Sequence, residues 1–520
     1  MIDFRKTAIG IELGSTRIKA VLIDEKGRVL SQGSYAWENQ FINNFWTYPV
    51  EDIHRGLQTC FLNLKNNFQN QYGKKLITTG SIGISAMMHG YMVFDENDQL
   101  LVPFRTWRNI NAESASKRLT NLFEYRVPAR WSISHLYQAI LEQEAHVKKI
   151  KFQTTLEGYI HYLLTGHKVI GIGEASGMFP IDTKTNNYDT KSLKIFNSIL
   201  ADNGYEFTLE QIFPRVLVAG EDAGKLTEKG ALFLDPSGEF QAGVMLCPPE
   251  GDAQTGMVAT NAIKPNTGNI SAGTSIFGMI VLEENLKTVY PEIDLVTTPI
   301  GDMVAMVHCN NCTSEINAWV SMVDEILKLF GTQINQDEIY EKLFKCSVEG
   351  KNNCDDIMVV NYLSGESITQ IENGRPLVTR KTKSQLRLRE FMRSQIYSCF
   401  ATLKLGFEIL FNEGVRLDKI AAHGGIFKTE GVAQKYLAAA LDTSVSVMKT
   451  AGEGGAWGMA LLALFAQKGG NLIEFLDSCI FKGREERIEK PDVEIKRGFD
   501  EYMENYKKVL IAEAVLSEKF

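Results

Sequence analysis

The stretch that decides the fold is "TAIGIELGSTRIKAVLID", residues 7–24. Its two apolar runs, 8–13 and 18–23, have the length and β-branched content of strands, and the Gly-Ser-Thr at 14–16 predicts a hairpin turn between them. Glu12 lies inside the first run, although a buried carboxylate costs several kcal/mol unless a partner compensates it. Glu12 is therefore either an edge or outward-facing residue or a group kept for function.

The same hairpin pattern occurs a second time, about half a chain later. "IELGSTRIKAVLI" aligns with "ISAGTSIFGMIVL", so that Ile11 falls on Ile270, Gly14 on Gly273 and Val21 on Ile280. The repeat predicts two domains of similar size, 1–260 and 261–520, each with a strand, a turn of Gly and two hydroxyl residues, and a second strand.

Such turns have a chemical use as well as a structural one. A glycine followed by two hydroxyl residues presents N–H and O–H donors where an anionic oxygen can approach closely. Two of them facing across a cleft would hold consecutive phosphates of a nucleotide, whereas the alternative is ordinary turn chemistry. No G-x-x-x-x-G-K-[ST] motif is present, and the third glycine of "GIGEASG" (171–177) comes one position too late for a dinucleotide fingerprint. Any phosphate is therefore bound by another architecture.

Composition excludes several classes of function. The 520 residues are 44% hydrophobic and 23% charged, as in a globular protein of two or more domains. The net charge of −8 is spread along the chain without a basic block, which argues against nucleic acid or an anionic membrane as partner and favours a small molecule. The N-terminal residues lack a signal-peptide core, and no apolar run approaches the ~20 residues of a membrane span. These features predict a cytoplasmic protein.

The eight cysteines do not form a disulfide framework. Cys309 and Cys312 are close together, with His308 beside them, but no second pair follows at the spacing of a zinc site. We therefore expect reduced structural cysteines rather than a metal or redox centre.

Asp252 is the first candidate catalytic residue. It follows Gly251 and precedes "AQTGMVATNA", a short predicted helix, so it is either an N-cap or a functional carboxylate. The base of a phosphoryl acceptor must lie close to the γ-phosphate, and Asp252 comes shortly before the second predicted phosphate turn.

Two further segments are candidates for the acceptor site. Met88-His89-Gly90 follows an apolar strand, and Trp107-Arg108-Asn109 lies in a loop before a polar helix. Polar groups beside an aromatic face are typical of sugar sites, while the alternative is a core histidine and a packing tryptophan.

Two glycine-rich turns late in the chain suit a flat ring. "HGGIFK" (423–428) follows a predicted strand, and "AGEGGAWG" (451–458) opens an apolar helix. Small residues here let an adenine lie against backbone, or they serve tight helix packing.

Six motifs in order, "GIELGSTRIKA", "MMHG", "GDAQTG", "SAGTS", "HGGIFK" and "AGEGGAWG", resemble the FGGY family of carbohydrate kinases from about residue 7 to 466. The Met-His-Gly segment is most similar to the xylulokinase branch. The resemblance implies an α/β fold of two actin-like, hexokinase-like (ribonuclease H-like) domains. Each would have a mixed five-stranded sheet, and the central cleft would bind ATP, Mg²⁺ and a sugar.

The resemblance also implies roles for individual residues. Asp252 would be the general base for transfer of the γ-phosphate to a ketose such as xylulose, and Glu12 and Asp252 would hold Mg²⁺, directly or through water. The residues expected at the sugar are Met88, His89, Gly90, Trp107, Arg108 and Asn109. Those expected at the nucleotide are Gly14, Ser15, Thr16, Lys19, Gly273, Thr274, Ser275, Gly424, Gly425, Lys428, Glu453, Gly454 and Gly455.

Three departures from the family pattern leave the substrate open. The family usually has Asp where this chain has Glu12, and xylulokinases typically have Asp-Asn and Trp-Asn-Asp where this chain has Asp252-Ala253 and 107–109. Arg108 adds a cation, which fits an acidic sugar, while ribulose and polyols are further options. A sugar sensor without phosphate transfer and a self-assembling actin-like ATPase are the rival functions. The oligomeric state, a homodimer included, is left open.

Overall fold

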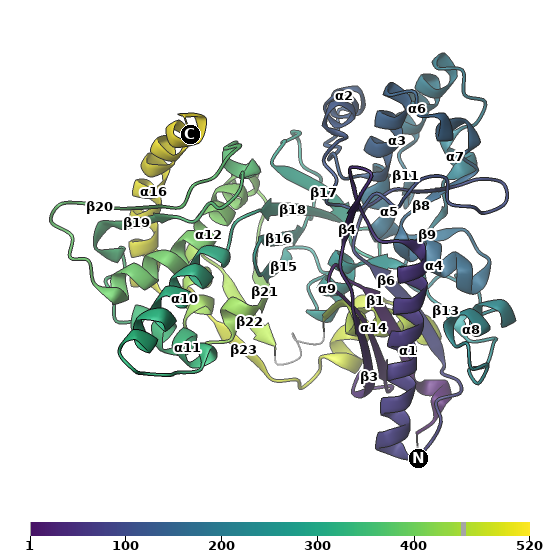
Figure 1. Cartoon of the computed structure of the whole chain (residues 1–520), viewed down its shortest axis with the longest axis horizontal. Helices are drawn as coiled ribbons and strands as arrows, with labels where there is room; N and C mark the ends of the chain where they lie inside the picture. The colour runs from purple at the N-terminus through teal and green to yellow at the C-terminus, as the bar shows by residue number, and fades with distance from the viewer. Residues whose placement is uncertain (1, 449–453, 520) are drawn as a thin grey trace. The chain divides into compact units, whose positions relative to one another are not determined.

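The computed structural model describes residues 2–448 and 454–519, and they form two compact units (Figure 1). The first unit comprises residues 2–263, 294–304 and 454–483, and the second comprises 264–293, 305–448 and 484–519. The predicted domains, 1–260 and 261–520, assigned 294–304 and 454–483 to the second half of the chain. These two segments instead belong to the first unit: residues 454–468 pack on the strands at 8–13 and 81–86, and Thr297 donates hydrogen bonds to Ser176 Oγ and the Ile172 carbonyl oxygen.

The sheet of the first unit grows from the hairpin of the opening stretch. Strands β1 (Ala8–Leu13), β2 (Arg17–Ile23) and β3 (Val29–Ala36) are antiparallel, whereas β6 (Ser81–Ala86) pairs with β1 in parallel. β13 (Met245–Leu246) extends the path to five strands, β13-β6-β1-β2-β3, and β14 (Glu250–Gly251) also pairs with β6. The sheet is mixed, as the resemblance implied.

Two long helices pack on opposite faces of this sheet, and glycines allow their close approach (Figure 1). A Cβ on Gly33 would lie 2.2 Å from the carbonyl oxygen of Cys60 in α1 (Val50–Tyr72). A Cβ on Gly10 would lie 2.1 Å from the carbonyl oxygen of Ala456 in α14 (Gly454–Lys468). Gly33 pairs with Ala20 on β2, and Ala20 pairs with Ile11 on β1. Because Ile11 is the neighbour of Gly10 and successive residues of a strand point to opposite faces, Gly33 and Gly10 face opposite sides of the sheet.

The remaining elements of the first unit surround this sheet. The helices are α2 (Glu113–Phe123), α3 (Ser132–Leu141), α4 (Leu156–Thr165), α5 (Ile172–Met178), α6 (Thr190–Asp202), α7 (Leu209–Ile212), α8 (Glu228–Leu234), α9 (Asp252–Ala259) and α15 (Leu472–Phe475). The short strands are β4 (Gln40–Ile42), β5 (Phe45–Thr47), β7 (Met92–Phe94), β8 (Phe152–Thr154), β9 (Val169–Gly171), β10 (Ile181–Asp182), β11 (Asn187–Tyr188) and β12 (Arg215–Leu217).

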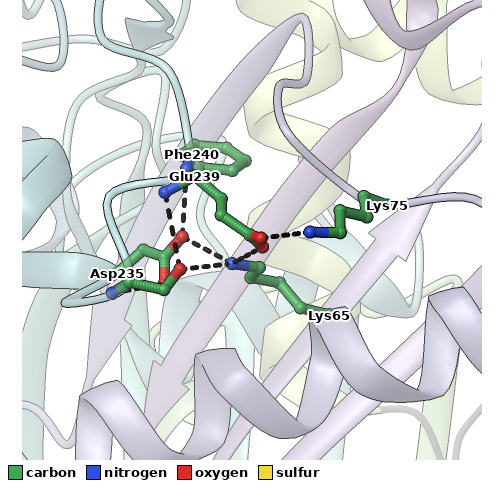
Figure 2. A network of polar contacts seen from close by, with 6 residues as sticks. Lys65, Lys75, Asp235, Glu239 and Phe240 are labelled. Atoms are coloured by element: carbon green, nitrogen blue, oxygen red, sulfur yellow. Dashed lines mark hydrogen bonds and ion pairs between the residues drawn. The ribbon is translucent and has the colours of Figure 1, made fainter.

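A buried ion pair fastens α1 to the segment after α8 (Figure 2). Lys65 Nζ lies 2.5 Å from Asp235 Oδ2 and 3.2 Å from Glu239 Oε2. Asp235 also accepts the Phe240 N–H at 3.0 Å, and Lys75 pairs with Glu239 at the surface. Because Lys65 is buried, its charge requires these partners, which fix the position of the loop.

The second unit repeats the hairpin and its parallel neighbour. β15 (Thr267–Ala272) pairs antiparallel with β16 (Ile276–Val281) and parallel with β21 (Lys419–Gly424), just as β1 pairs with β2 and β6. The sheet continues from β21 to β22 (Ser444–Met448) and β23 (Glu486–Glu489). The predicted repeat of strand, turn and strand is therefore confirmed.

Helices again cover the second sheet. They are α10 (Ser314–Leu329), α11 (Gln336–Ser347), α12 (Leu388–Asn412), α13 (Ala433–Leu441) and α16 (Val493–Lys519). β18 (Met303–Cys309) adds a strand to the sheet beside β16, and β19 (Ile357–Val360) pairs with β20 (Leu377–Arg380) in a separate two-stranded sheet. β17 (Ile293–Thr297) falls almost entirely in the segment 294–304 that belongs to the first unit. Among the described residues, no helix is long and apolar enough to cross a bilayer.

Candidate active site

Glu12 lies near the end of β1, in the interior of the first sheet. Its register partners are Lys19 on β2 and Ser85 on β6, so neighbouring strands flank it on both sides and the edge-residue alternative is wrong. Its Oε2 accepts the N–H of Ala456 at 3.1 Å, within the first turn of α14. The carboxylate therefore lies at a helix N-terminus, where the helix dipole favours negative charge.

The glycines before Ala456 make room for this carboxylate. A Cβ on Gly455 would lie 2.6 Å from Glu12 Oε1 and 2.7 Å from Thr255 Oγ1, which is too close for any side chain. Gly454 has φ +69°, a conformation that glycine adopts without strain. Both glycines belong to the first unit, whereas Gly424, Gly425 and Lys428 belong to the second. Glu453 lies outside the described residues.

Asp252 is the first residue of α9, and Gly251 holds the N-cap position. Its Oδ1 accepts the N–H of Met88 at 3.2 Å, so its side chain reaches the turn after β6. Asp252 is therefore not the N-cap of α9, and its side chain joins the predicted "GDAQTG" and "MMHG" motifs.

Glu12 and Asp252 are close enough to affect each other's charge. Burial and, after it, the Asp252 carboxylate raise the pKa of Glu12 to about 7, although Lys19 and the Ala456 N–H oppose the shift. Burial raises the pKa of Asp252 to about 6, against the lowering effect of the Met88 N–H. Because two nearby buried carboxylates are costly to ionise together, a cation beside them would stabilise their charged forms.

This donor set fits Mg²⁺. The ion usually takes one or two protein carboxylates together with water and substrate phosphates. Glu12 and Asp252 provide two carboxylates, and the described residues contain no group of three or more His, Cys, Asp or Glu that would hold a metal without a substrate.

The Met88–Gly90 turn is held from two sides. Asp252 accepts one N–H, and Glu174 Oε1 accepts the next, that of His89, at 2.8 Å. His89 has φ +69°, its Nδ1 lies 3.1 Å from the carbonyl oxygen of Gly177, and its ring stacks near Trp131 with the centroids 6.5 Å apart. The predicted Met-His-Gly motif is therefore a strained turn fixed beside Asp252.

Sequence reasoning missed Glu174 and its neighbours. Glu157, Glu174 and Glu250 are fully or almost fully buried, and burial raises the pKa of each carboxyl. Glu250 also accepts the N–H groups of Gly173 and Glu174, at 3.3 and 3.1 Å. For Glu174, the signal in the sequence is an acid between the small residues of "GIGEASG" (171–177).

The three residues of the 107–109 loop make different contacts. Trp107 donates its indole N–H to Ser15 Oγ at 3.3 Å, and the exposed Arg108 guanidinium lies 4.0 Å from the ring centroid of Trp46. Asn109 is 4% exposed, and its amide binds the Trp46 N–H and carbonyl, each at 2.8 Å. The expected sugar contact of Asn109 is therefore replaced by a structural one, because the β4–β5 hairpin uses both ends of its amide.

In the second unit, the loop after β18 supports the second hairpin. Thr313 donates to the Gly273 carbonyl oxygen through Oγ1 at 2.7 Å, and the Cys312 N–H donates to Thr274 at 2.9 Å. Cys309 and Cys312 are buried free thiols, as expected of structural cysteines.

A cavity of about 730 Å³ opens beside this hairpin, within the second unit. It brings together Gly273, Gly425 and Lys428, three of the predicted nucleotide residues, while Gly424 has φ +122° and a Cβ there would strike the Ala272 carbonyl. The other lining residues are Ala272, Thr313, Ile316, Asn317, Asp337, Tyr340, Glu341, Phe344, Lys345, Ile426, Thr429 and Glu430. Most come from α10 and α11, which carry no recognisable motif, so sequence reasoning missed them.

Comparison with known proteins finds similar proteins over most of the chain. The model of the FGGY family of carbohydrate kinases matches in its N-terminal domain over residues 7–238 and in its C-terminal domain over 268–467. A xylulose kinase of Haemophilus influenzae is 22% identical over 96% of this chain and 98% of its own length. A gluconokinase of Bacillus licheniformis is 25% identical over 51% of this chain and 50% of its own.

Solved structures share the fold. A ligand-bound xylulose kinase from Lactobacillus acidophilus has a TM-score of 0.81 at 17% identity and covers 99% of both chains. A gluconate kinase from the same organism has a TM-score of 0.80 at 17% identity, again over 99% of both chains.

Proposed function

This chain belongs to the FGGY family of carbohydrate kinases, and we propose that it transfers the γ-phosphate of ATP to a hydroxyl of a ketose such as xylulose. The observation that carries the proposal is the contact of Asp252 with the Met88 N–H, which joins the candidate base to the candidate sugar turn. Glu12 and the first Gly-Ser-Thr hairpin lie in the same unit.

Asp252 acts as the general base. The Met88 N–H orients the carboxylate through Oδ1 at 3.2 Å, and the carboxylate takes the proton of the acceptor hydroxyl. As the hydroxyl oxygen attacks the γ-phosphorus, its proton passes to Asp252, the new O–P bond forms and the bond to the β-phosphate oxygen breaks. A pKa of about 6 leaves the carboxylate ionised near neutral pH, while it stays basic enough to receive the proton.

Glu12 and Asp252 together would hold Mg²⁺, which when bound neutralises charge on the transferred phosphate. Lys19, the register partner of Glu12, adds a cation on the phosphate side. The donors of Ser15 and Thr16 bind phosphate oxygens.

The nucleoside occupies the cavity of the second unit. Its volume lies within the ~300–1,000 Å³ usual for ligand sites. Gly425 leaves the wall open, since no atom would lie within 4 Å of a Cβ there, and Lys428 offers a cation. The second hairpin at 273–275 contributes donors to the phosphates.

A specific observation favours a sugar acid as the second candidate substrate. Arg108 is exposed and its guanidinium is held over Trp46, so it can pair with a carboxylate in a fixed orientation. His89 and Trp107 would then bind the rest of the sugar.

The test is coupled ADP release with ATP and Mg²⁺ against ketopentoses, ketohexoses, polyols and aldonates, with a sugar-free blank. Turnover on a ketose supports the first candidate, and turnover restricted to aldonates supports the second. ATP binding without sugar-dependent turnover would overturn both in favour of a sensor. Equal ADP release with and without sugar, accompanied by nucleotide-dependent light scattering, would indicate a self-assembling ATPase.

A further inference from the structure

Three aromatic side chains donate hydrogen bonds to the first phosphate hairpin. Trp37 Nε1 donates to the Gly14 carbonyl oxygen at 2.7 Å, and Tyr48 Oη donates to that of Ser15 at 2.5 Å. Trp107 Nε1 donates to Ser15 Oγ at 3.3 Å. Trp37 and Tyr48 also stack, with ring centroids 4.2 Å apart. We refer to Trp37, Tyr48 and Trp107 as the aromatic collar.

The collar occupies the acceptors of the turn. The backbone N–H of Trp37 donates to the Thr16 carbonyl oxygen at 3.2 Å. All three carbonyl oxygens of the Gly-Ser-Thr turn therefore accept hydrogen bonds from within the first unit. A carbonyl oxygen directed at a phosphate would repel it, because both carry negative charge. The Gly14 N–H donates to the Arg17 carbonyl oxygen at 3.0 Å, so the N–H and O–H groups of Ser15 and Thr16 are the donors of the turn that suit an anion.

Trp107 acts on the hydroxyl itself. An indole N–H is a donor only, so Ser15 Oγ must be the acceptor in this bond. A serine hydroxyl has one hydrogen to donate, and that hydrogen is therefore directed elsewhere. The bond from Trp107 thus restricts the Ser15 hydroxyl to orientations in which it can donate to another group.

The loop that carries Trp107 is rigid on both sides of it. Thr106 is fully buried, and its N–H and Oγ1 donate to the Trp46 carbonyl oxygen at 3.2 and 3.1 Å. Asn109 binds the same backbone from the other side. Trp107 itself is 38% exposed, so the loop rather than a surrounding core sets the position of its ring.

We propose that Trp107 is a positioning residue for phosphate transfer, whose indole N–H orients the Ser15 hydroxyl toward the phosphate. The proposal rests on the kinase function and adds to it a link between the sugar loop and the phosphate hairpin. Trp107 then has two surfaces: its ring face is available to the sugar, and its N–H is committed to Ser15.

The test is a double-mutant cycle of Trp107→Phe and Ser15→Ala. Phenylalanine keeps an aromatic face and removes the N–H donor, and Ser15 is half-buried. We expect Trp107→Phe to lower kcat/KM for MgATP by roughly three- to tenfold, the range of one neutral hydrogen bond, with the sugar KM unchanged. In the Ser15→Ala background, Trp107→Phe should have no further effect.

Trp319→Phe is the matched control. It removes an indole N–H bond of 2.7 Å, to Glu315 on α10, and should leave both KM values unchanged. A rise in sugar KM alone for Trp107→Phe, or independent multiplication of the two effects in the cycle, would overturn the positioning role.

Failure of the kinase function gives a different result. If no sugar is phosphorylated by the wild type, the proposed reaction is wrong, and the cycle is measured as MgATP affinity by calorimetry. Coupled losses of affinity would still support the link between Trp107 and Ser15, whereas independent losses would refute it.

Discussion

The Glu12 carboxylate on β1 accepts the N–H of Ala456, 3.1 Å away in the first turn of α14. The bond joins residues from opposite ends of the sequence and holds an acid at a helix N-terminus. Burial and Asp252 nevertheless raise the pKa of Glu12 to about 7, so the stabilising contacts do not fully offset the cost of its charge. A divalent cation between these carboxylates would remove that cost, which gives the site a physical reason to bind one.

Replacing Asp252 tests the base directly. Asp252→Asn keeps an oxygen for the Met88 N–H but cannot accept the proton, so kcat should fall roughly 10²-fold or more with MgATP affinity retained. Initial rates and nucleotide calorimetry measure the two quantities. Asp324→Asn, which removes the ion pair with Lys328 within α10, serves as the control. A wild-type rate for Asp252→Asn would assign Asp252 a structural role only.

The same base predicts a pH profile. Because Asp252 must be ionised to accept a proton, kcat/KM for the sugar should rise with pH through an apparent pKa of about 6 and then level off. Steady-state rates between pH 5 and 8 at saturating MgATP measure it. A rate that falls over this range would contradict the assignment.

Glu12 should determine the Mg²⁺ requirement. Glu12→Gln can keep the bond from Ala456 but loses the charge that attracts the cation. The Mg²⁺ concentration for half-maximal rate should therefore rise about tenfold, while Glu12→Asp should restore much of the affinity. An unchanged magnesium titration would limit Glu12 to its contact with α14.

Stability should change with pH in the opposite direction to activity. Glu12 has a folded pKa of about 7, above its usual 4.5, so the folded state holds a proton that the unfolded state has lost between these values. Its contribution to stability is therefore lost as pH rises from 4.5 to 7, and Glu250, at about 8, extends the window. Without Mg²⁺, the urea midpoint should fall from pH 5 to 8, and Glu12→Gln should reduce that fall. An equal fall in both proteins would contradict the shift.

Filling the second-unit cavity should affect nucleotide binding alone. Gly425→Leu extends into open space, so the fold should tolerate it while the KM for ATP rises tenfold or more. Calorimetry with ADP and thermal denaturation separate binding from folding. Gly424→Leu is the contrast, because its Cβ would collide with Ala272 and should lower stability. Unchanged ADP affinity for Gly425→Leu would move the nucleotide site elsewhere.

The sequence predicted the features that depend on local turn chemistry. The two hairpin turns of Gly and two hydroxyl residues, the Met-His-Gly turn and the start of α14 all follow from small residues between apolar runs. The sheet architecture and the proximity of Glu12 and Asp252 were predicted from the family resemblance, because residues so far apart in sequence give no local sign that they are close in space.

Other features depend on contacts that local patterns do not encode. Asn109 binds Trp46, which is distant in sequence, and the local sequence around Asn109 does not indicate that the β4–β5 hairpin uses its amide. Glu174 could not be distinguished from a surface acid, because its partner is the His89 backbone. Asn317 and Tyr340 share a hydrogen bond of 2.5 Å at the cavity, but they lie on amphipathic helices without a motif.

The most direct test is to measure sugar phosphate by mass spectrometry after incubating wild type and Asp252→Asn with MgATP and the sugar that gives the highest turnover. The account predicts a sugar phosphate formed in equal amount to ADP by the wild type, and roughly 10²-fold less in the variant. ADP formation without a phosphorylated sugar, or equal product from both proteins, would contradict it.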